Sequence, residues 1–472
     1  MAVRTVSVLG GNWNATTAWV GGVVPIVGDT VDFTSLSGNL TVNVTTATLA
    51  GINFTNYVGI ITFNANIILN TSVNLGSGGY TQAGAFGLLI NNTTTIISNG
   101  TVWSRILTFS TNTSTITLSD NLYVTDNILL TSAASYTLNG NSLFVGSNLT
   151  MSANGLVGTS TIVFNGTGTW SNTSTGAVRN NVTINTLGTL TISGNVYYNT
   201  GILTHIAGVV DTSESTLNIA LATTLNTSGM TWNNVTITSG IQTLLSDLNV
   251  QNLASGGAGT NTINGLFNVN VSGNLTANGV VIGTATIVLI GTGTWTATNG
   301  SNTFRTPVII NANGIITLAN TLECGGNLKY IKGTVKANNT TISFTTSTLI
   351  NLHKLIFKNV LLGASTTITM NEFFSGSPSL VTNVNSTSGS NYTIAFQDGF
   401  EKISKFVNIS SCTLSKPLQL LVITKSKIKS TNRGIRYINQ SPNGIAKGVP
   451  SINSPMTFGV AGLLSDPNMQ IK

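Results

Sequence analysis

The stretch GTGTW occurs twice in this chain, at Gly166–Trp170 and again at Gly291–Trp295. Its surroundings are repeated as well. The first copy stands in STIVFNGTGTW and is followed by NNVTI and GTLTISGNVYY; the second stands in ATIVLIGTGTW and is followed by TPVII and GIITLANTLEC. A whole unit of strand-like segments around a tryptophan is therefore repeated, which is typical of solenoids and other repeat architectures.

Weaker copies of this unit surround other aromatic residues. Four tryptophans recur at nearly equal intervals, and they are Trp103, Trp170, Trp232 and Trp295. A further step of the same length reaches Phe357, and a shorter copy of the unit surrounds Phe54. We predict that they fill the interior at corresponding places, because a large aromatic ring is a natural core residue. The alternative is an exposed aromatic track that binds sugars.

Within each copy, apolar and polar residues alternate. In GTLTISGNV, Leu190, Ile192 and Val196 are apolar, whereas Thr191 and Ser193 are polar. A period of two places one side of a strand in the core and the other in water. Gly, Asn and Ser turns separate these segments, and no segment has a sustained helical period.

The sequence therefore predicts an all-β fold, a parallel β-solenoid rod built of ~63-residue units. A coil of about 20 residues would give three coils in each unit. The alternative is an array of small β-sandwich domains. It is disfavoured because the segments between units carry neither proline nor charge and show no shift in composition.

Composition limits the class of protein further. Hydrophobic residues make up 41% of the 472 residues and charged residues only 7%, so the chain can bury a core and does not resemble a disordered one. Two distant cysteines give no disulfide framework. No apolar run approaches the ~20 residues of a membrane span, so we expect no membrane-spanning helix. The first residues lack the pattern of a secretory leader, so we do not expect one.

The N-terminal segment, residues 1–50, is predicted to form a capping module. Residues 11–33 are GNWNATTAWVGGVVPIVGDTVDF. A solenoid end exposes apolar core and unpaired backbone, which Trp13 and Trp19 would cover, while Pro25 and Asp29 would build the turn into the first strand. Sugar binding by the two tryptophans is the alternative.

This motif resembles the opening module of β-solenoid structural proteins of tailed-phage virions, of the tail-fibre or spike type. The pattern carrying the resemblance is W…W-x-GG-x-x-P-x-x-GD-x-V-x-F, and it lies wholly within residues 11–33. The rest of the chain is similar in composition and periodicity. The resemblance implies a virion structural protein, assembled in the host cytoplasm, that contacts other virion proteins.

Residues 51–375 are predicted to form the solenoid body, and catalysis is not expected in it. Neither His205 nor His353 has a metal-ligand spacing, and we expect no metal or cofactor. A glycan-cleaving tailspike would need two carboxyl groups about 5 to 9 Å apart. Asp211 and Glu214 would meet only across a turn, and Asp120 and Asp126 lie about 20 Å apart in an extended strand. The sequence does not decide whether carboxyl groups from neighbouring coils form such a pair.

The C-terminal region, residues 376–472, is predicted to be basic and β-rich. Residues 1–320 contain four basic and seven acidic residues, whereas residues 321–472 contain fifteen basic and five acidic ones. ITKSKIKST places three lysines on one side of a strand. We predict a docking surface made by Lys425, Lys427, Lys429, Arg433 and Arg436. The alternative is an edge strand that lysines protect from aggregation. No aromatic residues alternate with the lysines, so we expect a protein partner and no nucleic acid.

Together these features favour a non-enzymatic tail fibre or spike of a phage virion, which extends rigidly and attaches to the host. We expect a homo-oligomer, with a trimer favoured, in contact with other virion proteins and with a host surface glycan or receptor. Three alternatives stay open. They are a capsid head fibre or decoration protein, a bacterial surface adhesin, and a glycan-degrading tailspike.

Overall fold

The computed structural model describes residues 1–319 except Gly78 and short gaps at 111–114, 132–134, 153–154, 173–175, 257–258 and 298–303. It also describes 322–324 and 326–335, and from residue 336 to 437 the backbone of the strands alone. The chain divides into two compact units, Met1–Val235 and Thr236–Lys472. Each unit is described by itself.

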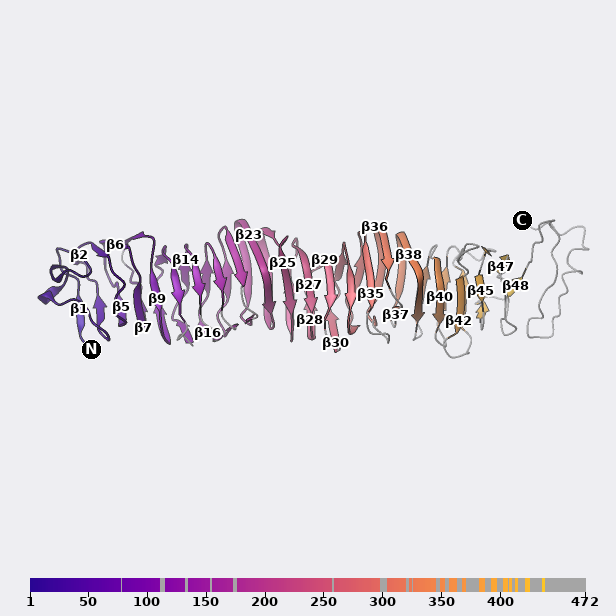
Figure 1. Cartoon of the computed structure of the whole chain (residues 1–472), viewed down its shortest axis with the longest axis horizontal. Coiled ribbons are helices and arrows are strands. Elements are labelled where there is room, and N and C mark those ends of the chain that lie inside the picture. The colour runs from indigo at the N-terminus through magenta and orange to yellow at the C-terminus, as the bar shows by residue number, and fades with distance from the viewer. Residues whose placement is uncertain are drawn as a thin grey trace, which may run out of the picture. The chain divides into compact units, whose positions relative to one another are not determined.

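Unit 1 is a parallel β-solenoid, with its strands following one another from coil to coil (Figure 1). The strand pairings divide these strands among three faces. The first face contains β1 (Val3–Thr5), β3 (Thr30–Asp32), β5 (Leu49–Asn53), β7 (Ile67–Asn74), β10 (Thr94–Ile97), β13 (Thr115–Leu118), β16 (Ser135–Gly140), β19 (Gly155–Val157), β22 (Ala177–Val178), the end of β23 (Val182–Tyr198) and β25 (Ser215–Ile219).

The second face begins with a four-stranded sheet of β2 (Gly11–Asn12), β4 (Leu40–Val42), β6 (Ile60–Phe63) and β8 (Thr81–Gly84). Further along it come β11 (Val102–Trp103), β14 (Leu122–Val124), β17 (Leu143–Val145), β20 (Ile162–Phe164), the start of β23, the start of β24 (Gly201–Asp211) and β26 (Thr223–Asn226). The third face contains the start of β7, then β9 (Leu88–Ile90), β12 (Leu107–Phe109), β15 (Ile128–Leu130), β18 (Leu149–Met151), β21 (Gly168–Asn172), the middle of β23 and the end of β24.

Unit 2 has the same three-face arrangement. One face contains β28 (Gly240–Leu244), β30 (Thr260–Asn264), β33 (Val280–Ile282), β37 (Leu322–Cys324), the end of β38 (Leu328–Phe344), β40 (Ile356–Leu362), β42 (Thr382–Ser386) and β45 (Val407–Ile409). The second contains β29 (Leu248–Ser255), β31 (Asn268–Val271), β34 (Thr286–Leu289), β36 (Val308–Leu318), β38 (Leu328–Phe344), β39 (Leu349–Leu352), β41 (Thr367–Met370), β43 (Tyr392–Phe396) and β46 (Cys412–Leu414).

The third face of unit 2 contains the end of β29, β32 (Leu275–Ala277), β35 (Gly293–Ala297), the end of β36 and the middle of β38. A separate sheet contains β44 (Lys402–Lys405), β47 (Leu421–Thr424) and β48 (Ile435–Tyr437). The strand β27 (Thr231–Ile237) contains the boundary between the units.

The register explains the alternation in the sequence. Leu107 pairs with Ile128, Ile128 with Leu149, and Leu149 with Trp170, so each residue meets the one about a coil later. All four are buried. The residues between them, such as Thr108, are partly exposed. The predicted all-β parallel solenoid is confirmed, with apolar ladders inside and polar residues outside.

The repeated GTGTW stretch marks a close approach of two coils. A Cβ on Gly166 or Gly168 would lie 2.0 Å or 2.2 Å from the carbonyl oxygens of Gly146 and Ser147 in the preceding coil. In the second copy, a Cβ on Gly293 would lie 1.9 Å from the carbonyl oxygen of the glycine that precedes it by one coil. Only glycine fits against that backbone, while the tryptophan that follows is buried. This packing accounts for the repetition of both glycines with the tryptophan.

Asparagine side chains join successive coils at the turns. Asn148 donates its Nδ2–H to Oδ1 of Asn127 at 2.7 Å, and its own Oδ1 accepts the backbone N–H of Thr169 at 2.7 Å. In unit 2, Oδ1 of Asn274 accepts the backbone N–H of Thr294 in the same way. These bonds supply coil-to-coil polar contacts that carry no charge and therefore no repulsion.

We expect Asn148→Ala to destabilise unit 1 by about 1–3 kcal/mol, because the partly buried N–H of Thr169 loses its acceptor. Asn127→Ala removes only side-chain bonds, to Asn148 and Ser147, and should cost less. The check is the urea midpoint of each variant by far-UV circular dichroism. Equal midpoints for Asn148→Ala and the unsubstituted chain would contradict this role.

Candidate functional site

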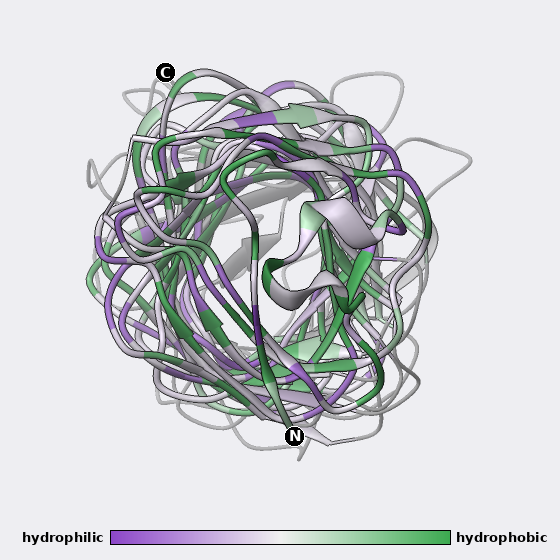
Figure 2. Cartoon of the chain, turned by 90° about the vertical axis from the view of Figure 1, so that its left-hand side faces the viewer, coloured by the Kyte–Doolittle hydropathy of each residue, from purple (hydrophilic) through white to green (hydrophobic). Residues whose placement is uncertain are grey.

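The N-terminal segment closes the first coil of unit 1. Two short 3-10 helices, η1 (Thr16–Ala18) and η2 (Val20–Gly22), lie inside the ring of backbone in the view onto the N-terminal end (Figure 2). Trp13 and Trp19 are each 2% exposed, and their rings meet edge to face at 4.8 Å. Trp19 donates its Nε1–H to the carbonyl oxygen of Trp13 at 2.8 Å. The two rings cover the interior and present little surface to a ligand.

Asp29 fixes the turn that leads from this segment into the first coil. Its Oδ2 accepts hydrogen bonds from Nε of Arg4 at 2.8 Å and from the N–H of Ile26 at 3.3 Å, and its Oδ1 accepts the N–H of Ala2 at 2.9 Å. The bond from Arg4 is the largest cause of a lowered pKa, and the backbone bond from Ala2 adds to it, which brings the pKa of Asp29 to about 2. Pro25, in the same turn, is buried.

The lowered pKa gives the capping segment a pH dependence. The ionised form of Asp29 is favoured by folding, so its contribution is present above its unfolded pKa, about 3.9, and is lost as the pH falls through the folded value of about 2. We expect Asp29→Asn to lower stability at pH 7 by about 1.5–3 kcal/mol, the range for bonds to a charged group.

The check is the thermal midpoint of both proteins between pH 7 and pH 2. The difference between them should shrink between about pH 4 and pH 2. Glu214→Gln, which removes an exposed carboxyl group from the same unit, is the control. A pH-independent difference would contradict the role of the Asp29 charge.

Behind the cap lies an aromatic cluster. Phe33 stacks on Phe54 with ring centroids 4.5 Å apart, and Phe54 stacks on Tyr80 at 4.9 Å. Tyr57 packs against Phe33 and Tyr80 at 4.9 Å and 5.6 Å, and its hydroxyl donates to the carbonyl oxygen of Ile60 at 2.9 Å. Burial raises the pKa of both tyrosines. Sequence reasoning placed only Phe54 in the interior and noted Phe33 only as the last residue of the motif at 11–33; the spacing of one coil between Phe33 and Phe54 is the signal that would have linked them.

The four repeated tryptophans lie inside the solenoid. Trp103 and Trp295 are 1% exposed, and Trp170 and Trp232 are 0% exposed, so their ring faces are closed to sugars. Trp170 and Trp295 occupy matching places in β21 and β35, whereas Trp103 lies in β11 on another face. Phe357 lies in β40, and its side chain is outside the described residues.

Carboxylates of the body bind backbone N–H groups. Asp120 accepts the N–H groups of Ser98 and Asn99 at 2.7 Å and 2.6 Å, and Asp126 accepts that of the residue that follows it. Asp211 accepts the N–H of Ser213 at 3.0 Å, and this bond lowers its pKa. A general acid for glycan cleavage needs a raised pKa, so the shift at Asp211 has the wrong sign for that role. These side chains act as turn acceptors.

His205 holds two turns together. Its Nδ1 lies 2.6 Å from the carbonyl oxygen of Ser228, and its Nε2 lies 3.1 Å from that of Gly208. Among the described residues, no three His, Cys, Asp or Glu side chains gather where they could hold a metal ion. His353 lies outside the described residues.

The predicted basic docking surface falls largely outside the described residues. Lys425, Lys427, Lys429 and Arg433 are not among them. Arg436 lies in β48, of which the backbone alone is described. The docking role of this surface therefore stays a prediction.

No protein-family model, no curated protein and no solved structure matches this chain. In the part of the chain that the structure describes, no helix has the length and apolar character needed to cross a membrane.

Proposed function

We propose that this chain is a non-enzymatic structural protein of a tailed-phage virion, a fibre or spike that extends rigidly and attaches to the host. The observation that carries the proposal is the coil-to-coil bonding. In the described coils, backbone pairs in register, a buried apolar ladder and asparagine side chains join one coil to the next. Such bonding resists bending and proteolysis, because local opening breaks all three kinds of contact.

The motif at residues 11–33 supports the phage assignment. The resemblance to the opening module of virion solenoids came from its tryptophans, proline and aspartate. In the structure Trp13, Trp19 and Asp29 are buried, and Asp29 is bonded to Arg4. These residues do the structural work that such a module requires, which is to cover the end of a solenoid.

The engaged carboxylates support the non-enzymatic part of the proposal. Asp120 uses both of its oxygens on backbone N–H groups, and Asp211 is held in its ionised form by Ser213. Groups used in this way hold turns and would lose those bonds on protonation.

The partners in this proposal follow from charge. The body is nearly uncharged, whereas residues 321–472 carry fifteen basic and five acidic residues. A basic surface favours an acidic partner protein, and we assign attachment to a neighbouring virion protein to Lys425, Lys427, Lys429, Arg433 and Arg436. The remaining surface would contact a host glycan or receptor, and the assembly would be a homo-oligomer, with a trimer favoured.

The test is a cryo-EM reconstruction of phage particles made by cells that carry this gene, with the chain located in the map. We expect a solenoid attached to the tail or baseplate. Copies on the capsid shell would replace the proposal with a head fibre or decoration protein. Absence from purified particles, with the chain found on the bacterial surface, would favour an adhesin. Loss of polymer from a capsule treated with the purified chain would favour a glycan-degrading tailspike.

A further inference from the structure

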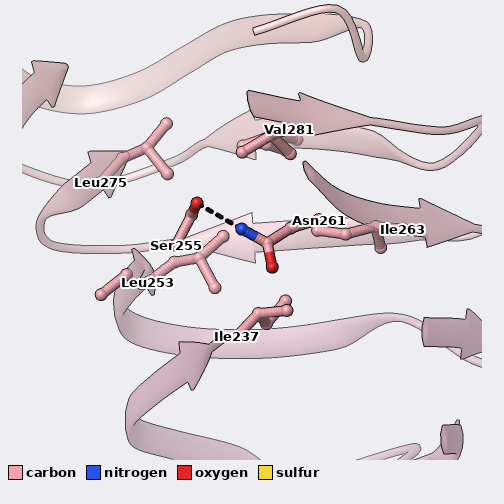
Figure 3. Close-up of a pocket in the computed structure, with 9 residues that line it drawn as sticks. Ile237, Leu253, Ser255, Asn261, Ile263, Leu275 and Val281 are labelled. Atoms are coloured by element: carbon pink, nitrogen blue, oxygen red, sulfur yellow. Dashed lines mark hydrogen bonds between the residues drawn. The ribbon is translucent and has the colours of Figure 1, made fainter. Parts of the chain in front are cut away.

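Apolar side chains inside the coils pack against one another. In unit 2, buried aliphatic residues such as Leu253, Leu275 and Val281 leave a space of about 10 Å³ between coils (Figure 3). A site for a small molecule needs about 300 Å³ or more, so this space admits none. Apolar residues that point outward are a different case, because they remain open to water in the single chain.

Four outward-pointing apolar residues follow one another along the second face of unit 1. Val102 in β11 pairs with Tyr123 in β14, one coil later. Tyr123 pairs in turn with Phe144 in β17, and Phe144 with Val163 in β20. The residues beside them in these strands are buried, whereas Val102 is 47% exposed and the other three are partly exposed. These four residues are called the apolar strip below.

The first face of the same unit is polar at its outward positions. The residues that follow one another in register there are Ser72, Thr95, Thr117 and Asn139. Their hydroxyl and amide groups bond to water, which the rings and methyl groups of the apolar strip do not. An outward apolar strip beside a polar face marks an interaction surface.

An exposed aliphatic residue extends the strip toward the N-terminal end. Ile60 is 41% exposed and pairs with Thr81 in the next coil. Gln82, the residue after Thr81, donates its Nε2–H to the carbonyl oxygen of Val102, which places β8 beside β11. The strands from Ile60 to Val163 are β6, β8, β11, β14, β17 and β20. At ~4.8 Å for each coil, they cover about 24 Å of the solenoid.

The geometry of the two rings favours a protein partner over a sugar. Tyr123 and Phe144 are stacked, with ring centroids 4.3 Å apart and an angle of 15° between the ring planes. A sugar binds an aromatic residue by lying on an open ring face, and here the two facing ring faces cover each other. Because the stacking runs from coil to coil, the pair presents ring edges outward. Ring edges and aliphatic groups pack against other apolar side chains.

The charged residues nearest to the strip in sequence are bonded to the backbone. The guanidinium of Arg105 donates to two carbonyl oxygens of the preceding coil. Asp120 accepts two backbone N–H groups of the preceding coil, and Asp126 accepts that of the residue that follows it. In a contact between identical surfaces, each charge near the symmetry axis would face its own copy. A strip whose nearest charges are engaged in this way is suited to self-association.

We propose that copies of this chain pack side by side through the apolar strip, around a common axis parallel to the solenoid. A partner for the strip must present apolar groups at intervals of one coil, and a second copy does so because it has the same coils. A parallel axis sets Tyr123 of one copy level with Tyr123 of the next. This parallel order rests on the function proposed above, because a fibre attached at one end needs all copies to point the same way.

The first experiment is sedimentation equilibrium of the full chain and of a double variant, Tyr123→Lys with Phe144→Lys. We expect the unsubstituted chain to be an oligomer at micromolar concentration. The double variant should associate at least about 100-fold more weakly, since its ammonium groups would be buried without partners. The matched control is Thr95→Lys with Thr117→Lys, which adds the same charge to neighbouring coils of the first face and should associate like the unsubstituted chain. Far-UV circular dichroism checks that both variants fold.

A monomeric unsubstituted chain, or an oligomer that survives the double variant, would overturn the proposal. The surviving oligomer would leave the homo-oligomer of the proposed function standing, with its contact elsewhere. Location of the chain in phage particles tests that function separately. A monomer that binds a host glycan and loses this binding in the double variant would make the strip a sugar site and would also overturn the proposal.

A crosslinking experiment tests the parallel order. Under mild oxidation, Tyr123→Cys should form a disulfide-linked dimer, because the two substituted positions lie level across the axis. The unsubstituted chain, with its own Cys324 and Cys412, is the control. Antiparallel copies would set Tyr123 opposite Phe144. A crosslink that forms only when Tyr123→Cys is mixed with Phe144→Cys would therefore contradict the parallel order.

Discussion

Trp170→Ala is expected to lower the free energy of unfolding of unit 1 by about 3–5 kcal/mol, the usual cost of truncating a buried aromatic side chain. Trp170 is 0% exposed and stands between Leu149 and Ile192 in the inner ladder. Its ring stacks on Phe164 with centroids 5.2 Å apart. Truncation leaves a cavity that the ladder cannot close, because the backbone pairs of both neighbouring coils fix its walls.

The measurement is the urea midpoint by far-UV circular dichroism, with hydrogen exchange to localise the loss to the strands around β21. Trp170→Phe is the matched control. Nε1 of Trp170 has no hydrogen-bond partner among the described residues, so phenylalanine keeps most of the apolar contact and sacrifices no bond. We expect it to cost less than about 1.5 kcal/mol. If both variants lost the same free energy of unfolding, the volume of the side chain at position 170 would not be what stabilises the ladder.

Gly293→Ala is expected to destabilise unit 2 by about 3 kcal/mol or more, at or above the upper end of the cost of overpacking a core. An added Cβ would lie 1.9 Å from the carbonyl oxygen of Gly273 and 2.3 Å from its carbon. Both atoms are backbone, so no side-chain rotation relieves the clash. The coils must separate, and the pairing of β35 with its neighbours weakens.

The control is Gly259→Ala in the same unit, where the added Cβ meets no atom within 4 Å. This variant should be neutral or slightly stabilising, since alanine restricts the unfolded chain. Gly168→Ala, where the carbonyl oxygen of Ser147 lies 2.2 Å from the added Cβ, should reproduce the effect in unit 1. Thermal midpoints of all three variants decide the matter. If Gly293→Ala and Gly259→Ala had the same midpoint, the close approach would not be what selects glycine in GTGTW.

The class of fold could be predicted from the sequence because it depends on local patterns. Alternation in segments such as Leu190–Val196 assigns inner and outer faces without knowledge of any partner, and Gly and Asn mark the turns. The buried Trp13, Trp19 and Asp29 are likewise recognisable from residues 11–33 alone. The basic character of residues 376–472 is also a property of composition, and its docking role awaits a test.

Partners one coil apart could not be predicted, because the coil length varies. Paired positions lie 19 apart at Leu88 and Leu107, 21 apart at Ile128 and Leu149, and 22 apart at Leu253 and Leu275. A change of one residue moves a side chain to the other side of the strand. The spacing of the tryptophans also misleads: the ladder that begins at Trp103 passes through Val124 and Val145 to Phe164 in β20, so Trp103 lies on a different face from Trp170 in β21.

By itself the sequence determined that apolar and polar residues alternate, that turns separate the strands and that the whole unit repeats. It therefore determined that the chain forms coils with an apolar interior. Only the tertiary structure decided which residues meet: Arg4 with Asp29, Asn127 with Asn148, and Gly293 with the backbone of Gly273. The physical reason is that the strand itself decides whether a side chain points inward or outward. Which side chains meet between coils depends on the length of every turn that separates them.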